Sequence, residues 1–257
     1  MGRMTGRTVL ITGAAGGIGK ECVQALLADG WQVFGLDIRE LEANTEGRND
    51  SAGKLTPLHV DVSDAASVEK AFAEIARHTQ RINALICCTG ILRAGPLENM
   101  ANEAFDSIFA VNVRGPWLCA KAAVPLLARA SQSAYPSRMI FLSSVAAFRP
   151  KLSGGAYSAT KSALETITRT FAGELASRGI LVNAVAPGPV DTPFVQQASA
   201  PGSGGGYKPG GQGSIPLSRI ASPREVAALI KFLLGDDSTY MTGAIVALDG
   251  GISAVRM

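Results

Sequence analysis

The sequence predicts an α/β fold, a doubly wound parallel sheet of about seven strands with helices on both faces. Short, continuously apolar runs recur along the chain, as expected for strands buried on both faces. Amphipathic helical segments alternate with these runs. The 257 residues, 47% of them hydrophobic, suffice for one large core, so we expect a single domain over 1–257.

The predicted strands and helices follow one another in order. The apolar runs lie at 7–11, 31–36, 55–60, 84–88, 138–142, 180–185 and 244–248. Helical patterns occupy about 17–29, 64–79, 102–130, 156–177 and 223–235, and the third is expected to bend at Gly115-Pro116. The segment at about 193–215 is rich in Gly and Ser and too long for a routine connection, so we predict a flexible substrate lid there.

The first predicted strand leads into a glycine-rich turn, V-L-I-T-G-A-A-G-G-I-G-K, that opens the first helix. Gly13, Gly17 and Gly19 fall at this turn. Glycines there permit backbone conformations that a Cβ hinders, and they let the main chain approach a pyrophosphate beside the free amides of a helix end. We expect a dinucleotide to bind here. The alternative is a tight structural turn, and the Gly-x3-Gly-x-Gly spacing differs from the usual G-x-G-x-x-G.

The residues around Asp37 predict which dinucleotide binds. Asp37 ends the second predicted strand, where a carboxylate can accept hydrogen bonds from ribose hydroxyls and would repel a 2′-phosphate. No Lys or Arg occurs at 14–16, and Ile38 follows the aspartate. These features favour NAD over NADP. Arg39 argues the other way, because its side chain could fold back toward a phosphate.

The stretch G-A-Y-S-A-T-K places Tyr157 and Lys161 four residues apart, and therefore on one face of a predicted helix. Leu164 and Thr168 continue that face, which is otherwise the inward side, so a lysine there is unusual. Either Lys161 extends off the end of the buried face or it acts on Tyr157. A nearby ammonium would favour the phenolate and lower the pKa of the phenol from its ordinary value of about 10.

Composition excludes several classes of function. The net charge of +3 comes from interspersed charges, and no basic run with interleaved aromatics supports nucleic-acid binding. No apolar run reaches membrane length, and the amino terminus lacks the apolar stretch of a signal peptide. The spacing of Cys22, Cys87, Cys88 and Cys119 fits neither a zinc site nor a disulfide framework. We expect a cytoplasmic protein without a metal and without membrane association.

Several motifs, taken in order, resemble the compact short-chain dehydrogenase/reductase family. They are T-G-A-A-G-G-I-G (12–19), D-V (61–62), S-S (143–144), Y-S-A-T-K (157–161) and P-G-P-V-D-T (187–192), and the match runs to T-G-A-I-V-A-L-D-G-G at 242–251. The resemblance implies a single Rossmann-like domain, commonly assembled as a homotetramer. It also implies hydride transfer between a nicotinamide and an alcohol or carbonyl carbon of a small-molecule substrate.

The resemblance implies roles for individual residues. Tyr157 would be the acid/base with Lys161 beside it, and Ser144, with Ser143 as the neighbouring candidate, would hold the substrate oxygen. Asn112, in F-A-V-N-V-R-G, would support a water chain to the lysine. The implied cofactor-binding residues are Gly13, Ala15, Gly17, Ile18, Gly19, Asp37, Ile38, Asp61, Val62, Cys88, Gly90, Tyr157, Lys161, Pro187, Gly188, Val190 and Thr192. Of these, Asp61 and Val62 would contact the adenine, and the last four would flank the nicotinamide.

One motif departs from the family. C-C-T-G stands at 87–90 where the family usually has N-N-A-G. The family's asparagines mainly brace the sheet, so the departure puts sheet stability in doubt and leaves a backbone role for Gly90. A redox-active pair, Cys87 and Cys88, is one alternative. Because adjacent strand side chains point to opposite faces, we expect two separately packed thiols instead.

These features together predict an NAD-dependent oxidoreductase acting on a secondary alcohol or ketone with a hydrophobic skeleton. The candidate pocket residues are mostly apolar: Ile91, Leu92, Arg93, Val145, Ala146, Phe148, Phe194 and Tyr207. Arg93, Arg149 and Lys151 would either receive an acidic group or form solvated surface. The alternatives are a 3-oxoacyl-thioester reductase and a non-catalytic nicotinamide-binding regulator. A sugar-nucleotide epimerase of the extended relatives would need a separate carboxyl-terminal substrate domain.

Overall fold

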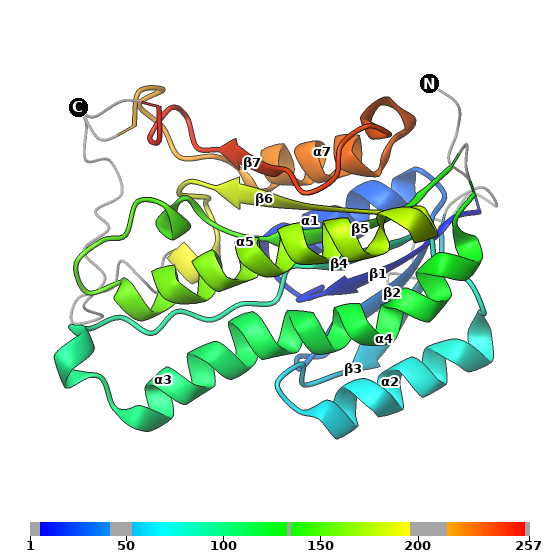
Figure 1. Cartoon of the computed structure of the whole chain (residues 1–257), viewed down its shortest axis with the longest axis horizontal. Helices are drawn as coiled ribbons and strands as arrows, with labels where there is room; N and C mark the ends of the chain where they lie inside the picture. Colours follow the sequence, from blue (N-terminus) through cyan, green and yellow to red (C-terminus); the bar gives the residue numbers. More distant parts are fainter. Residues whose placement is uncertain (1–5, 42–52, 133–134, 196–214, 255–257) are drawn as a thin grey trace.

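A computed structural model describes residues 6–41, 53–132, 135–195 and 215–254. Within these ranges seven parallel strands form one sheet in the order β3-β2-β1-β4-β5-β6-β7 (Figure 1). The strands are β1 (Thr8–Thr12), β2 (Gln32–Asp37), β3 (Leu55–His59), β4 (Ala84–Cys87), β5 (Ser137–Leu142), β6 (Ile180–Pro187) and β7 (Ile245–Leu248). The predicted doubly wound parallel sheet is confirmed.

Helices cover both faces of the sheet (Figure 1). On one face lie α2 (Ala65–His78), α4 (Gly115–Ala130) and α5 (Gly155–Leu175), whose apolar sides share a core with alternate strand residues. On the other face lie α1 (Gly17–Ala28) and α7 (Pro223–Leu234), which pack on each other and on a second core. Since both faces are buried, the strands read as continuous apolar runs. Among the described helices, none combines the length and the apolarity needed to span a membrane.

The long helical segment predicted at 102–130 is divided by a wider turn. α3 (Asn102–Phe109) runs into a π-helix over Ala110–Arg114, and α4 begins directly after it at Gly115. We predicted a bend at Gly115-Pro116. The structure has a π-turn that ends directly before these residues, and Pro116 lies in the first turn of α4. Asn112 lies within this π-turn and is fully buried.

The strand order reverses beside β1, which lies between β2 and β4. Connections leave β1 and β4 toward opposite sides of the sheet at this point, and doubly wound sheets bind their ligands in the crevice that results. Gly13 directly follows β1 and Cys88 directly follows β4. The predicted phosphate turn and the C-C-T-G segment thus meet at the carboxyl end of the sheet.

The two edges of the sheet are formed by β3 and β7. β3 contains Pro57, which has no backbone N–H. The amide of Val60 donates to the Asp37 carbonyl on β2 (2.9 Å), and amide directions alternate along a strand. Position 57 therefore faces away from β2, so the proline removes no hydrogen bond from the sheet.

The predicted lid at about 193–215 lies mostly outside the described residues. Positions 196–214, including Tyr207, belong to the part that the structure does not describe, whereas Phe194 and Ile215 are described.

Candidate cofactor and catalytic site

Close contacts shape the turn between β1 and α1. Gly13 has φ +69°, and a Cβ built on it would lie 2.9 Å from the amide nitrogen of Thr89. A Cβ on Gly19 would collide with the carbonyl oxygen of Gly13. Side chains are therefore excluded at both positions, and the main chain of the turn is left accessible to a ligand.

The amino terminus of α1 has no side-chain cap, as at α3, α4 and α5 but in contrast to α2 and α7. Asp64 accepts hydrogen bonds from the amides of Ala66 (3.1 Å) and Ser67 (3.2 Å) at the start of α2. α7 begins with a capping box between Ser222 and Glu225. At α1 the capping position is Gly16, no side chain accepts from the first turn, and that turn contains no acidic residue. The positive end of this helix fits the pyrophosphate of a dinucleotide.

Asp37, at the end of β2, lies beside this turn. Its Oδ2 accepts from the amide of Ala15 (3.0 Å) and its Oδ1 from the amide of Arg39 (2.9 Å). Burial alone would raise the pKa of Asp37, but the hydrogen bonds from Arg39 and Ala15 lower it below its ordinary value. The carboxylate is thus ionised and oriented toward the phosphate turn. Ile38 is 60% exposed.

Arg39 does fold back, as the alternative to strict NAD preference anticipated. Its guanidinium donates to both oxygens of Asp37, from Nε to Oδ1 (3.2 Å) and from Nη2 to Oδ2 (3.3 Å). It also lies over Gly16, where a Cβ would stand 2.6 Å from Nη2. A cation therefore lies beside Asp37, where the 2′-hydroxyl of the adenosine ribose, or a phosphate on that hydroxyl, is expected.

The predicted adenine-contacting residues form a turn after β3. Asp61 accepts from the amide (2.9 Å) and the hydroxyl (2.7 Å) of Ser63, so its carboxylate holds its own turn together. Val62 is buried, and a Cβ on Gly115 would lie 2.8 Å from its Cγ2. Arg114 in the π-turn donates to the Ser63 carbonyl (2.7 Å). The turn after β3 is thereby attached to the π-turn that contains Asn112.

The predicted catalytic side chains come from two neighbouring elements. Ser144 follows β5 and caps a short 3-10 turn, with its Oγ accepting from the amide of Ala146 (3.2 Å). Tyr157 and Lys161 lie on the first turns of α5, and Ser144 shares a hydrogen bond with Tyr157. Nζ of Lys161 lies 5.6 Å from the centroid of the Tyr157 ring. The structure therefore brings the three together.

Asn112 bridges the segment after β4 and helix α5. Its Oδ1 accepts from the amide of Ile91 (2.8 Å), and its Nδ2 donates to the Ile91 carbonyl (2.9 Å) and to Oγ1 of Thr160 (3.2 Å). Thr160 in turn donates to the Tyr157 carbonyl (2.7 Å). A Cβ on Gly90 would lie 3.5 Å from Asn112 Oδ1 and 3.7 Å from Lys161 Nζ. These predicted site residues thus form one connected cluster.

Burial dominates the electrostatics of Tyr157 and Lys161. Burial raises the pKa of Tyr157 to about 12, and the hydrogen bond with Ser144 only partly opposes this. Burial also lowers the pKa of Lys161 to about 8, while the thiols of Cys88 and Cys87 act in the opposite direction. Nζ of Lys161 donates to the Leu142 carbonyl (2.7 Å). In the protein alone, burial thus raises the pKa of Tyr157. The expected lowering of this pKa by Lys161 together with the positive nicotinamide of an oxidised cofactor stays a prediction.

The predicted nicotinamide-end residues follow β6. The amide of Gly188 donates to the Leu248 carbonyl (2.9 Å), directly after Pro187 ends the strand. Val190 and Thr192 are buried, and the methyl of Thr192 would lie 3.1 Å from a Cβ on Gly17. This segment therefore reaches the phosphate turn.

The four cysteines are free thiols that pack on different sides of the sheet. Cys87 belongs to the core under α2, α4 and α5 together with Cys119, and burial raises its pKa well above the ordinary value. Cys88 packs against the opposite core with Cys22, whose pKa is raised first by a hydrogen bond with Cys88 and then by burial. The expected placement of adjacent thiols on opposite faces is confirmed. Within the described ranges, no cluster of three or more His, Cys, Asp or Glu side chains could hold a metal ion.

Sequence analysis missed two contacts of this site. Oγ of Ser143 donates to Oε1 of Glu165 (2.9 Å), and both side chains are buried. Glu165 follows Lys161 by four residues, so its position on the buried stripe was a signal that could have identified it. The ring of Phe194 packs against that of Tyr157, with centroids 5.8 Å apart, and no sequence pattern indicated this contact.

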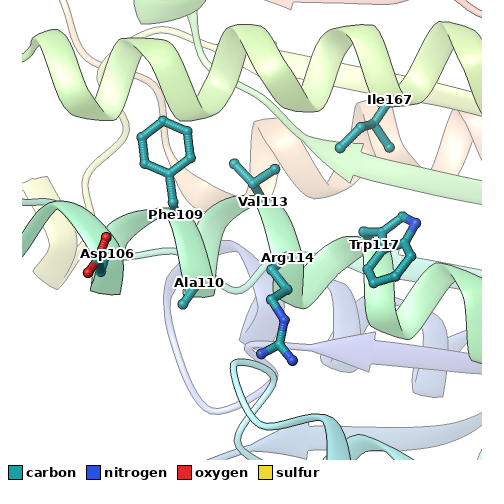
Figure 2. A pocket seen from close by; sticks show the side chains of 7 residues that line it. All are labelled: Asp106, Phe109, Ala110, Val113, Arg114, Trp117 and Ile167. Carbon is teal, nitrogen blue, oxygen red and sulfur yellow. The ribbon is translucent and has the colours of Figure 1, made fainter.

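A separate hollow of about 400 Å³ lies away from these residues, on the face formed by α3, α4 and α5 (Figure 2). Its lining is Asp106, Phe109, Ala110, Val113, Arg114, Trp117 and Ile167. Figure 2 shows that Ile167 comes from α5 and the others from the α3–α4 segment. Trp117 is 40% exposed, so this face leaves large apolar side chains uncovered.

Comparison with known proteins places the chain among oxidoreductases. A family model described as enoyl-(acyl carrier protein) reductase matches residues 13–253. The uncharacterised oxidoreductase YxbG of Bacillus subtilis is 33% identical over 261 residues, covering 99% of this chain and 93% of that protein. The 3-oxoacyl-[acyl-carrier-protein] reductase FabG of Thermotoga maritima is 31% identical over 252 residues (97% and 99%). Cyclopentanol dehydrogenase of Comamonas is 32% identical over 258 residues (99% and 100%).

Solved structures agree with this placement. A short-chain type dehydrogenase/reductase from Mycobacterium marinum superimposes with a TM-score of 0.87 at 28% identity, covering 98% of this chain and 97% of that one. The 3-ketoacyl-(acyl-carrier-protein) reductase of Brucella melitensis, solved in complex with NADH, gives a TM-score of 0.82 at 25% identity (97% and 99%).

Proposed function

The chain belongs to the short-chain dehydrogenase/reductase family, whose members are nicotinamide-dependent oxidoreductases acting on CH–OH groups, and from this premise we propose that it uses NAD to interconvert a secondary alcohol and a ketone. The observation that carries the proposal is the gathering of Ser144, Tyr157 and Lys161 at the carboxyl end of the sheet, beside the uncapped start of α1.

The residues of the chain divide the chemistry among them. When bound, a nicotinamide supplies the hydride acceptor for oxidation and the hydride donor for reduction. As the phenolate, Oη of Tyr157 takes the hydroxyl proton of the alcohol during oxidation; as the neutral phenol, it donates that proton to the reacting oxygen during reduction. Oγ of Ser144 donates a hydrogen bond to the reacting oxygen and stabilises the charge that develops on it. Lys161, held by the Leu142 carbonyl, keeps a positive charge beside the phenol at neutral pH.

The remaining predicted cofactor-binding residues would hold the dinucleotide from end to end. The amides at the start of α1 would bind the pyrophosphate, and Asp61 and Val62 would border the adenine. Thr192, which lies against Gly17, would connect the phosphates to the nicotinamide end. Asp37, ionised and buried, supports NAD because it would repel a 2′-phosphate.

The substrate proposal rests on the apolar character of the predicted pocket. Phe194 packs on Tyr157, and Phe148, just after the short turn capped by Ser144, is 44% exposed. A hydrophobic alcohol or ketone suits such a lining, and cyclopentanol dehydrogenase is among the relatives. A 3-oxoacyl-thioester reductase is the second candidate, because a relative is named for that reaction. A non-catalytic regulator would not need Ser144, Tyr157 and Lys161 together.

We propose further that residues 1–257 act as one domain and that the protein is a cytoplasmic homotetramer. The apolar hollow on α3, α4 and α5 supports an assembly of copies, because exposed aromatic and aliphatic side chains on one face indicate an interaction surface.

Tyr157→Phe tests the proposed function. We expect the variant to lose at least about a hundredfold in turnover of the best substrate of an alcohol panel, because the proton acceptor is removed. It should still bind NADH, measured by fluorescence titration. Tyr240→Phe is the matched control, since Tyr240 is fully exposed. Turnover by Tyr157→Phe at the wild-type rate would refute the proposal, and a preference for 3-oxoacyl thioesters would select the second candidate.

A further inference from the structure

One stripe of α5 contacts three consecutive residues at the end of β5. Tyr157, Lys161 and Glu165 follow one another at intervals of four along this helix, so they lie on the same side of it. Each forms a hydrogen bond with one residue of the segment 142–144: Tyr157 with Ser144, Lys161 with the Leu142 carbonyl (2.7 Å), and Glu165 with the Ser143 hydroxyl (2.9 Å). The helix therefore holds the end of this strand at three successive positions.

The contact between Ser143 and Glu165 is buried on both sides. Ser143 is 2% exposed and Glu165 is 7% exposed. The amide of Ser143 also donates to the Val185 carbonyl on β6 (2.8 Å), so the residue is held by the sheet through its main chain and by α5 through its side chain. A hydroxyl has only one proton to donate. Since Ser143 donates it to Glu165, Ser143 offers no proton to a substrate oxygen.

Glu165 is an unusual residue for this position. A buried carboxylate loses its hydration, and an apolar side chain on the stripe would avoid that cost. Oε2 of Glu165 lies 3.6 Å from Nη2 of Arg169, whose side chain is 57% exposed, and such a surface pair contributes little to stability. The hydrogen bond to Ser143 is therefore the contact of Glu165 that an apolar residue could not replace.

The position of Ser143 determines that of Ser144. The two residues are joined by one planar peptide, which keeps their Cα atoms about 3.8 Å apart. Oγ of Ser144 accepts from the amide of Ala146 (3.2 Å) and shares a hydrogen bond with Tyr157. A displacement of Ser143 would thus move Oγ of Ser144 relative to the phenol. A misplacement of about 1 Å at a reacting centre can lower the rate about a hundredfold.

We propose that Glu165 is a positioning residue, which binds Ser143 and thereby holds Oγ of Ser144 at the reacting oxygen of the substrate. The inference rests on the proposed function, since it takes Ser144 to donate to that oxygen. It goes beyond that function because it assigns a role in turnover to a carboxylate that touches neither the substrate nor the cofactor.

The test compares kcat, KM and NADH affinity of Glu165→Ala and Ser143→Ala with those of wild type, on the best substrate of the alcohol panel. We expect each variant to lose about tenfold or more in kcat, because Ser144 is misplaced, whereas KM and NADH affinity change less than about threefold. Both substitutions remove the same contact, so the double variant should lose no more than either alone. Glu165→Gln retains an acceptor oxygen for Ser143 and should restore kcat to within about threefold of wild type.

Two control variants separate the buried contact from other properties of the helix. Glu174→Ala removes an exposed carboxylate from the same helix. Arg169→Ala removes only the surface ion pair of Glu165. Both should turn over like wild type. If Arg169→Ala lost as much kcat as Glu165→Ala, the ion pair and not the contact with Ser143 would matter, which would overturn the inference.

A second background distinguishes positioning from a merely structural role. In Ser144→Ala there is no hydroxyl to misplace, so adding Glu165→Ala should lower kcat by less than about twofold further. A loss there as large as in wild type would overturn the inference. So would a lowered Tm of Glu165→Ala with unchanged kcat. If Glu165→Ala did not fold, Ser143→Ala, which removes a single oxygen, would provide the same comparison.

The outcomes also separate this inference from the proposed function. Turnover that depends on Tyr157 but is unchanged in Glu165→Ala and Ser143→Ala would overturn the inference alone. If Tyr157→Phe were as active as wild type, or wild type turned over no substrate of the panel, the proposed function itself would fail, and the inference with it.

Discussion

At the scale of single residues, Lys161 is a cation whose surroundings oppose its charge. It is 3% exposed, and its amine donates to the Leu142 carbonyl. Burial lowers its pKa from 10.5 to about 8, so at neutral pH the folded protein keeps a desolvated ammonium. The function proposed for Lys161 thus carries a cost in stability, as is common at active sites.

Lys161→Met should abolish turnover and stabilise the fold at neutral pH. The pKa shift corresponds to about 3 kcal/mol at most, with each pKa unit equivalent to about 1.4 kcal/mol. Below pH 8, Lys161 is protonated in both the folded and the unfolded state, so the buried ammonium destabilises the wild-type fold by the full amount. Between pH 8 and 10.5 the unfolded state binds more protons, and wild type gains stability as pH rises. Urea unfolding at pH 7 and at pH 10 measures this.

The expected result is a stability advantage of Lys161→Met that shrinks between those two pH values. An advantage of equal size at both would contradict the burial of a charged amine, and would indicate better packing of the methionine instead. Lys161→Arg serves as the control for charge, since it stays protonated throughout and should not gain stability.

Residue types and their spacing identified much of the candidate site, because side chains four residues apart lie on the same face of a helix. Tyr157 and Lys161 had to share a face of α5 if the segment was helical at all. Glu165 was missed although it continues the same i+4 series, because a carboxylate four residues before Arg169 looks like half of an ordinary ion pair on a helix surface. Its buried partner, Ser143, is 22 residues away and becomes adjacent only through the fold.

At the scale of elements, the junction of β1 and α1 depends on close approach of backbone to backbone. Gly19, in the first turn of α1, lies directly over the Gly13 carbonyl. The helix can start immediately after the strand only because neither position carries a side chain in the gap. The direction of α1, whose start points to the predicted phosphate site, follows from this contact.

Gly19→Ala should therefore impair folding and dinucleotide binding together, since the added Cβ would displace α1 from β1. Gly173→Ala is the matched control, because Gly173 lies inside α5 with nothing within 4 Å of an added Cβ. We expect the control to gain up to about 1 kcal/mol from helix propensity. Thermal unfolding and NADH titration of both variants check this, and a Gly19→Ala protein with wild-type Tm and affinity would refute the contact.

Elements with a regular apolar period were predicted within a few residues, whereas the π-turn over Ala110–Arg114 was not. A π-turn contains one more residue than an α-helical turn but has no distinct residue composition. It therefore becomes visible only through its tertiary contacts. In this case the contacts are the Asn112 amide on Ile91 and the Arg114 guanidinium on Ser63. Both belong to long-range packing that local patterns do not encode.

At the scale of the whole molecule, the apolar hollow on α3, α4 and α5 is the feature that supports assembly. Trp117→Glu should convert the proposed tetramer, four copies of a 26.6 kDa chain, into smaller species, because it places a charge in the buried contact. Sedimentation velocity measures the change. Tyr135→Glu is the control, since Tyr135 is 51% exposed and lies outside that hollow. Sedimentation of Trp117→Glu like wild type would contradict the proposal.

Global topology was predictable because few arrangements satisfy alternating strands and helices. Connections between neighbouring parallel strands cross in one hand only, so the order of elements nearly determines the sheet. The contacts that the protein makes with a second copy of itself or with a substrate were less predictable. Those contacts depend on surface shape, for which the sequence has no periodic signal.

The two edges of the sheet differ in how well they can pair with a further strand. Pro57 presents a carbonyl but no N–H on the outer side of β3, so an incoming strand would find a gap in its ladder there. β7, with the sequence Ile-Val-Ala-Leu, has neither a proline nor a charge along its length. Strand addition, whether by another copy during assembly or by a misfolded neighbour during aggregation, is therefore directed to the carboxyl-terminal side of the protein.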